Sequence, residues 1–69
     1  KKNMTSQAIT ALREATDRAP KNATFHYHLG MAYAKAGDKV KARAALETAL
    51  KLQSDFPGAD EARSTLASL

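Results

Sequence analysis

The chain has 69 residues, a formal net charge of +4 and no cysteine. This length supports one small core, which excludes a second domain, and the lack of cysteine excludes disulfides and thiolate metal sites. No apolar stretch approaches the roughly 20 residues of a transmembrane helix, so a soluble protein is expected. A cytoplasmic location is favoured, although the sequence identifies no compartment.

The first predicted element is an amphipathic helix over residues 5–19. Its apolar residues recur at steps of three and four: Met4, Ala8, Ile9, Leu12, Ala15 and Ala19. Pro20 ends this helix, and Asn22 is a good N-cap for a second one. The stripe of the second helix is Phe25, Leu29, Tyr33 and Ala36.

Gly37 and Asp38 separate the second predicted helix from a third. Glycine supplies a left-handed stop and aspartate an N-cap, and so short a linker forces an antiparallel hairpin. The expected buried stripe of the third helix is Val40, Ala42, Leu46, Ala49 and Leu50. Residues 55–58 predict a turn, and a last helix from about residue 60 has Ala62, Leu66 and Leu69 on one face.

The chain repeats itself at the spacing of a helix pair. When 34 is added to the residue number, Ala8, Leu12 and Ala15 fall on Ala42, Leu46 and Ala49. At an offset of 37, Pro20, Phe25, Leu29 and Gly30 fall on Pro57, Ala62, Leu66 and Ala67. The first and third helices are therefore equivalent, as are the second and fourth, which is typical of a solenoid.

One segment of this repeat resembles the tetratricopeptide repeat (TPR) signature: His26-x2-Leu29-Gly30-x2-Tyr33, followed by Ala42-x3-Leu46-x2-Ala49. His26 stands where the family usually has tryptophan or another large apolar residue, and Ser54 stands where its closing proline falls. The resemblance implies an all-α fold of about four helices, in which antiparallel helix-turn-helix pairs stack as a right-handed superhelix.

The resemblance covers nearly all of a single domain, residues 1–69. Residues 23–56 match a complete repeat, residues 5–19 the second helix of a preceding repeat, and residues 60–69 a first or capping helix. The amino end is then expected to be cut, which leaves Met4, Ile9 and Leu12 partly uncovered and predicts a homodimer through the first helix or by helix exchange. The carboxyl end is expected to be natural, because a polar outer face suits a cap: Glu61, Ser64, Thr65 and Ser68.

The sequence indicates no catalytic, cofactor or metal site, and we expect no enzyme. His26 and His28 point about 200° apart on a helix, so they cannot share an ion. A packed, hydrogen-bonded His26 and a partly exposed His28 are favoured. The acidic pairs Glu14 with Asp17 and Asp60 with Glu61 fit capping and solubility better than catalysis. Neither a serine-histidine-acid set nor a glycine-rich phosphate loop is present.

Instead, the resemblance implies a protein-interaction scaffold that holds a peptide or a partner's helix in a concave groove. The groove residues would be Thr24, Tyr27, His28, Met31 and Lys35. Their spacing places them on one side of the helix, opposite Leu29. Tyr27, Met31 and Lys35 would supply an aromatic anchor, an adaptable apolar contact and a cation. The alternative is that these residues face water or a missing repeat, and the partner's identity cannot be read.

A second class of function is a basic helical nucleic-acid-binding domain, because cations surround one hairpin: Lys35, Lys39, Lys41, Arg43 and Lys51. Asp38 and Glu47 interrupt this cluster and aromatic residues are sparse, which favours a solvated face. A third interpretation is a non-catalytic segment of a larger protein. TPR repeats also occur beside glycosyltransferase domains and in bacterial secretion or exopolysaccharide-export proteins. Residues 56–63 resemble a stretch of some of those export proteins.

Overall fold

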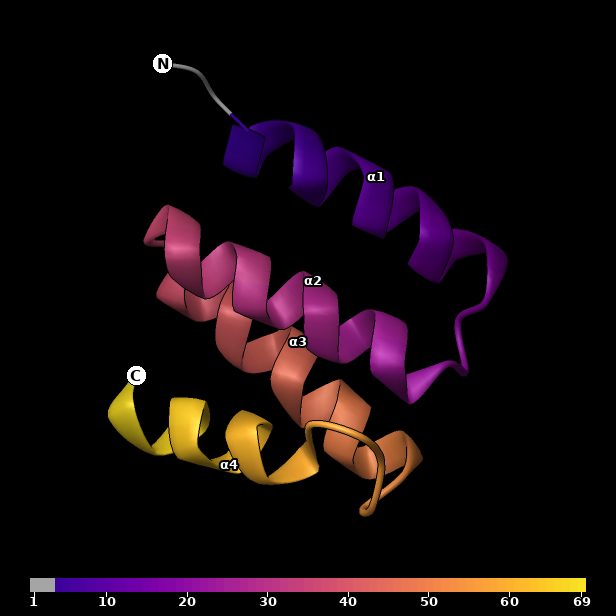
Figure 1. Ribbon diagram of the computed structural model, residues 1–69, viewed down its shortest axis with the longest axis vertical. Coiled ribbons are helices and arrows are strands. Elements are labelled where there is room, and N and C mark those ends of the chain that lie inside the picture. The colour runs from indigo at the N-terminus through magenta and orange to yellow at the C-terminus, as the bar shows by residue number, and fades with distance from the viewer. Residues whose placement is uncertain (1–3) are drawn as a thin grey trace.

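The computed structural model describes residues 4–69, which form four helices and no strand. The helices are α1 (Met4–Arg18), α2 (Ala23–Ala36), α3 (Lys39–Leu52) and α4 (Ala59–Ser68). α2 lies in the middle, with α1 on one side, α4 on the other and α3 behind it (Figure 1). The prediction of an all-α fold with four helices is confirmed.

Local capping sets the ends of the two central helices. The side-chain oxygen of Asn22 accepts a hydrogen bond from the backbone N–H of Phe25 at 3.1 Å, and Asp38 does the same for Lys41 at 3.1 Å. Gly37 has a φ of 87°, in the left-handed region that favours glycine. These contacts confirm the predicted caps and fold α2 back against α3 through a very short turn.

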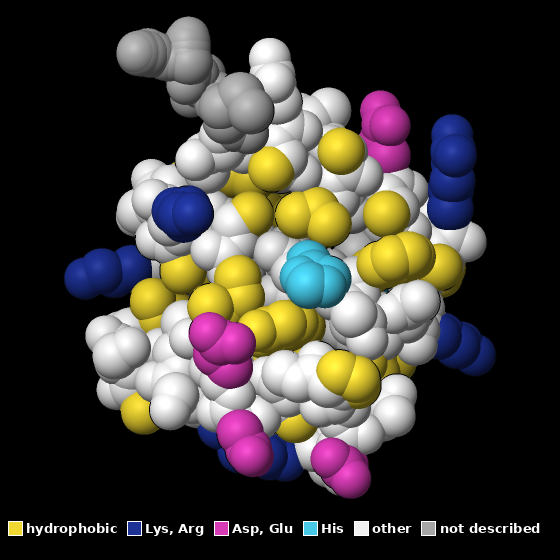
Figure 2. All heavy atoms as spheres, viewed as in Figure 1, with side chains coloured by type: hydrophobic (Ala, Val, Ile, Leu, Met, Phe, Trp, Pro, Cys, Tyr) yellow, Lys and Arg dark blue, Asp and Glu magenta, His cyan; other side chains and the backbone are white. Residues whose placement is uncertain are grey.

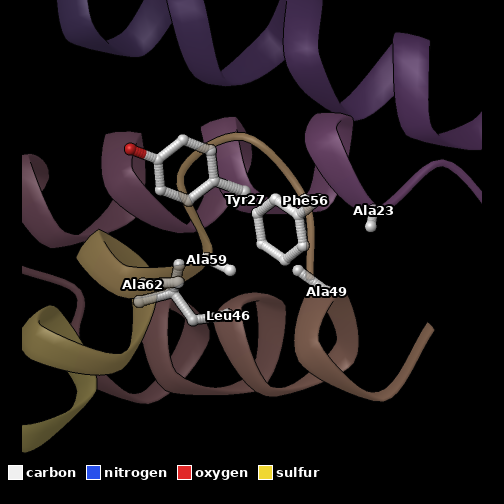
Figure 3. Close-up of a cluster of buried hydrophobic side chains, with 7 residues drawn as sticks. All are labelled: Ala23, Tyr27, Leu46, Ala49, Phe56, Ala59 and Ala62. Carbon is white, nitrogen blue, oxygen red and sulfur yellow. The ribbon is translucent and has the colours of Figure 1, made fainter. Parts of the chain in front are cut away.

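The core lies between α2, α3 and α4. α2 contacts each of the other helices, whereas α1 contacts only α2 among the helices of residues 4–69. A buried cluster joins α2, α3 and α4 (Figure 3), and its members are Ala23, Tyr27, Leu46, Ala49, Phe56, Ala59 and Ala62. In α1, Ile9 and Leu12 are only half-buried, as expected. The side chain of Met4 lies outside the described part of the chain.

Gly30 sets the distance between α2 and α3. A Cβ atom placed on Gly30 would lie 2.6 Å from Cγ of Leu46, well inside normal contact distance. Leu46 itself is completely buried. The small residue on α2 therefore makes room for the large residue on α3, and this pairing fixes how closely the two helices approach.

The expected burial of Val40 is wrong. Val40 is 80% exposed, although the predicted stripe of the third helix included it. It lies two positions from the fully buried Ala42, about 200° around the helix, and so points to solvent. Residues 55–58 do form bends and turns, but Phe56 within them is only 5% exposed and belongs to the core.

Two residues of the predicted polar outer face of α4 contact α2 instead of facing solvent alone. Glu61 accepts a hydrogen bond from the hydroxyl of Tyr27, and Thr65 is half-buried beside Met31. Ser64 and Ser68 are exposed, as a polar outer face requires. The apolar face of α4 is as predicted, with Ala62 fully buried.

Candidate functional site

An open apolar groove of about 590 Å³ lies between the first half of α1 and the second half of α2. Its lining residues are Thr5, Ala8, Met31, Ala32, Ala34 and Lys35. Figure 2 shows hydrophobic side chains gathered over α2 and along its seam with α1. Among residues 4–69 the lining consists of alanine methyl groups, a threonine, the thioether of Met31 and the cation of Lys35. Such a lining suits an apolar side chain that has an anionic neighbour.

Met31 and Lys35 are the two predicted groove residues that line this groove. Met31 is half-buried and packs against the core cluster. Its sulfur accepts a hydrogen bond from the Thr65 hydroxyl at 3.5 Å, so Met31 also contacts α4. Lys35 is exposed in the last turn of α2, where a cation complements the helix dipole.

Tyr27 lies in the core and does not line the groove, which corrects its assignment as an exposed aromatic anchor. Its side chain is 8% exposed, and its ring centroid lies 5.7 Å from that of Phe56. In Figure 3 the two rings lie next to each other and the tyrosine hydroxyl points away from the alanines of the cluster. That hydroxyl donates to Oε1 of Glu61 at 2.6 Å, which joins α2 to α4.

The environment of Tyr27 changes its acidity. The hydrogen bond to Glu61, followed by burial and by the negative charge of that carboxylate, raises the pKa of Tyr27 above its ordinary value of 10.0. All three causes favour the neutral phenol over the phenolate. Tyr27 is therefore a packed structural group that stays protonated at neutral pH.

The other predicted groove residues, Thr24 and His28, are absent from the lining of the groove. Thr24 is half-buried, and His28 is exposed with its ring centroid 5.1 Å from that of Tyr27. His26 is half-buried, and its Nε2 atom makes a hydrogen bond with the carbonyl oxygen of Pro20 at 2.8 Å. The structure thus brings Met31 and Lys35 together, without Thr24, Tyr27 or His28.

Sequence reasoning did not assign any α1 residue to the site, yet Thr5 and Ala8 form one wall of the groove. The available signal was the run of small residues on the two facing helices. Ala8 on α1 and Ala32 and Ala34 on α2 fill little of the space between the backbones. An alanine-rich seam next to a longer Met31 leaves a hollow between α1 and α2.

A comparison with family models decides what kind of protein this is: the tetratricopeptide repeat model matches residues 3–60. The chain belongs to the tetratricopeptide-repeat family. Neither a search of curated proteins nor a search of solved structures found a significant match. TPR repeats are typically non-catalytic scaffold modules that bind other proteins, so a protein partner is the general expectation for this TPR chain.

The TPR signature positions lie on α2 and α3 and are buried or half-buried: Leu29, Gly30, Tyr33, Ala42, Leu46 and Ala49. They lie in or beside the contact between α2 and α3 and differ from the α2 residues that line the groove. None of the four TPR helices in residues 4–69 has both the length and the hydrophobicity that a membrane span requires.

Proposed function

We propose that this TPR chain binds an extended peptide or a partner's helix in the groove between α1 and α2. The observation that carries the proposal is the open, apolar groove of about 590 Å³, in which Lys35 is the only charged lining residue among residues 4–69. An apolar side chain of the ligand contacts Met31 and Ala8, and a neighbouring carboxylate of the ligand lies near the ammonium of Lys35.

We also propose that residues 23–56 are the complete repeat, residues 5–19 the second helix of a preceding repeat, and residues 60–69 the first helix of a following one. The recurrence of the apolar pattern supports this assignment. Ala8, Leu12 and Ala15 fall on Ala42, Leu46 and Ala49 at an offset of 34, and Leu29 falls on Leu66 at an offset of 37.

Selection of peptides from a random phage-displayed library with the 69-residue chain tests the groove. Fluorescence polarisation then gives the affinity of each selected peptide for the wild type and for two variants, Met31→Gln and Lys35→Glu. Each variant is expected to bind about tenfold more weakly, because it removes apolar contact or reverses the charge of a residue that touches the ligand.

Lys51→Glu is the matched control, because Lys51 is also an exposed cation and lies on α3, outside the groove. It makes the same change of charge and is expected to leave the affinity unchanged. Peptides that bind the wild type, Met31→Gln and Lys35→Glu with equal affinity would refute the groove as the binding site.

The nucleic-acid alternative has less support, because two cations of the basic cluster make contacts within the chain. Arg43 donates to the carbonyl of Leu69 at 3.3 Å, and the ammonium of Lys41 lies 5.8 Å from the centroid of the Tyr33 ring. The same polarisation assay with DNA and RNA oligonucleotides at low salt compares the two functions. Tight binding that weakens steeply with added salt would favour the nucleic-acid function.

A further inference from the structure

Met31 contacts both sides of α2. It lines the groove between α1 and α2, and it packs against the core cluster. Its sulfur also accepts a hydrogen bond from the Thr65 hydroxyl of α4 at 3.5 Å. Met31 therefore connects α4 with the groove, although the lining among residues 4–69 comes from α1 and α2 alone.

The hydrogen bond of Thr65 differs from those of other threonines in the helices. The usual acceptor for a helical threonine is a backbone carbonyl three or four residues earlier in the same helix. Three threonines donate to such a carbonyl: Thr10, Thr16 and Thr48. Thr65 is half-buried and donates to a side chain of another helix. Its hydroxyl therefore contributes to the contact between α2 and α4.

The contact at the sulfur limits where the side chain of Met31 can lie. A methionine side chain has three rotatable bonds, and the first two determine the position of the sulfur. A sulfur held beside Thr65 fixes those two torsions and keeps the side chain towards α4. On the α1 side, Ala8, Ala32 and Ala34 carry only methyl groups and leave the hollow of the groove. A methionine released from Thr65 is long enough to rotate into this hollow.

We propose that Thr65 is a positioning residue for the groove: its hydroxyl holds Met31 towards α4 and so keeps the hollow beside α1 open for an apolar side chain of the ligand. This inference deepens the proposed function and rests on it. Thr65 acts through Met31 without touching the ligand. α4 thereby sets the size of the side chain that the groove accepts, because a methionine that fills the hollow leaves no room for a large one.

Peptides selected with the wild-type chain test this role in fluorescence polarisation. Each peptide is measured in two forms, one with its apolar anchor intact and one with the anchor replaced by alanine. Thr65→Val removes the hydroxyl but keeps the size and β-branching of the side chain. It is expected to bind the intact form about threefold more weakly, an effect of the size of a weak hydrogen bond, and to bind the alanine form like the wild type.

Two further variants show whether the effect depends on the hydroxyl and on the sulfur. Thr65→Ser keeps the hydroxyl and is expected to bind both forms of each peptide like the wild type. Met31→Leu removes the sulfur acceptor, so adding Thr65→Val to it is expected to cause no further loss of affinity. Circular dichroism of each variant verifies that the four helices are retained.

Nuclear magnetic resonance of the free chain tests the same contact without a ligand. The carbon shift of a methionine methyl group depends on the rotamer of its side chain, and the chain has two methionines. The signal of Met31 is the one that Met31→Leu removes. Thr65→Val is expected to shift this signal, and Thr65→Ser to leave it at the wild-type position.

Thr48→Val is the matched control. Thr48 is also half-buried, but it lies on α3, outside the groove, and its hydroxyl donates to the carbonyl of Ala44. The control makes the same chemical change as Thr65→Val. It is expected to alter neither the methyl signal of Met31 nor the affinity for either form of the peptides.

Three results would overturn the proposal. A Met31 signal that is identical in the wild type and Thr65→Val shows that the hydroxyl does not hold the methionine. Peptides that lose affinity in Met31→Gln but bind Thr65→Val as tightly as the wild type show that the groove works without Thr65. Peptides that bind Met31→Gln and Lys35→Glu like the wild type refute the groove itself, and a methyl signal that still shifts in Thr65→Val distinguishes this failure from the first.

Discussion

α1 and α3 share one apolar pattern and differ in what that pattern contributes to stability. Leu46 of α3 is fully buried between α2 and α4, while Leu12, its equivalent in α1, is half-buried against α2 alone. A leucine stabilises the chain in proportion to the area that its neighbours remove from water. The comparison teaches that the repeat pattern specifies which face of a helix is apolar, and that the neighbouring helices determine how much of that face is buried.

The largest expected contrast comes from truncating the two equivalent leucines. Leu46→Ala is expected to lower the free energy of unfolding by about 3–5 kcal/mol, because it leaves a cavity in the core. Leu12→Ala is expected to cost about 1 kcal/mol, since part of its side chain already contacts water. Urea denaturation followed by circular dichroism at low protein concentration measures both. Equal costs would mean that α1 is covered as completely as α3.

A second contrast uses Gly30, which faces Leu46, and Ala67, its equivalent in α4 at an offset of 37. Gly30→Leu is expected to cost more than about 2 kcal/mol, because the space beside Leu46 is already filled. Ala67→Leu, at the equivalent exposed position of α4, is expected to change the stability of the monomer by less than about 0.5 kcal/mol. Thermal melts compare the two variants. An unchanged melting temperature in Gly30→Leu would contradict the close approach of α2 and α3.

The four helices and their central caps could be predicted because those signals are local. Asn22, Gly37 and Asp38 act within a few residues of their own positions, and helical periodicity needs only one helix to be visible. The repeat offsets likewise compare the chain with itself. These features needed no knowledge of how the helices lie in space.

The errors concern residues whose burial depends on another element. Tyr27 was placed in the groove because it lies opposite the Leu29 stripe, but α4 and Phe56 cover that side of α2. Phe56 follows no helical periodicity, so nothing local marks it as core. Half of the groove was missed for the same reason, since the wall supplied by Thr5 and Ala8 exists only when α1 packs on α2.

A smaller difference in stability is expected between alanine substitutions at two glycines with left-handed backbones, because only one of them lies against Tyr27 on the side of α2 that α4 covers. Gly37 has a φ of 87°, and within residues 4–69 an added Cβ would meet nothing within 4 Å beyond its own stretch of backbone. At Gly58, with a φ of 102°, an added Cβ would lie 2.6 Å from the Tyr27 ring. Gly37→Ala is expected to cost about 1 kcal/mol from backbone strain, and Gly58→Ala about 2 kcal/mol because the ring must also move. Chemical denaturation measures both, and equal costs would show that the ring moves aside freely.

The smallest expected effect is that of the hydroxyl that joins α2 to α4. Tyr27→Phe keeps the ring against Phe56 and removes only the hydrogen bond to Glu61. Because that carboxylate belongs to an exposed residue, it regains water when the hydroxyl is lost. The expected cost at neutral pH is therefore about 0.5 kcal/mol, at the low end for a hydrogen bond. Urea denaturation at pH 7 measures it, and a cost as large as that of Leu46→Ala would show that the ring is displaced.

The same variant has a pH dependence with a defined sign. The folded chain raises the pKa of Tyr27 above 10.0, so folding favours the protonated phenol. The resulting stabilisation is fully present below pH 10 and is lost as the pH rises through the raised pKa. The wild type should therefore lose stability relative to Tyr27→Phe above about pH 10. Urea denaturation of both chains between neutral pH and this range tests the prediction, and lysine titration cancels because both chains share it. A stability difference that does not change with pH would show that folding leaves the acidity of Tyr27 unaltered.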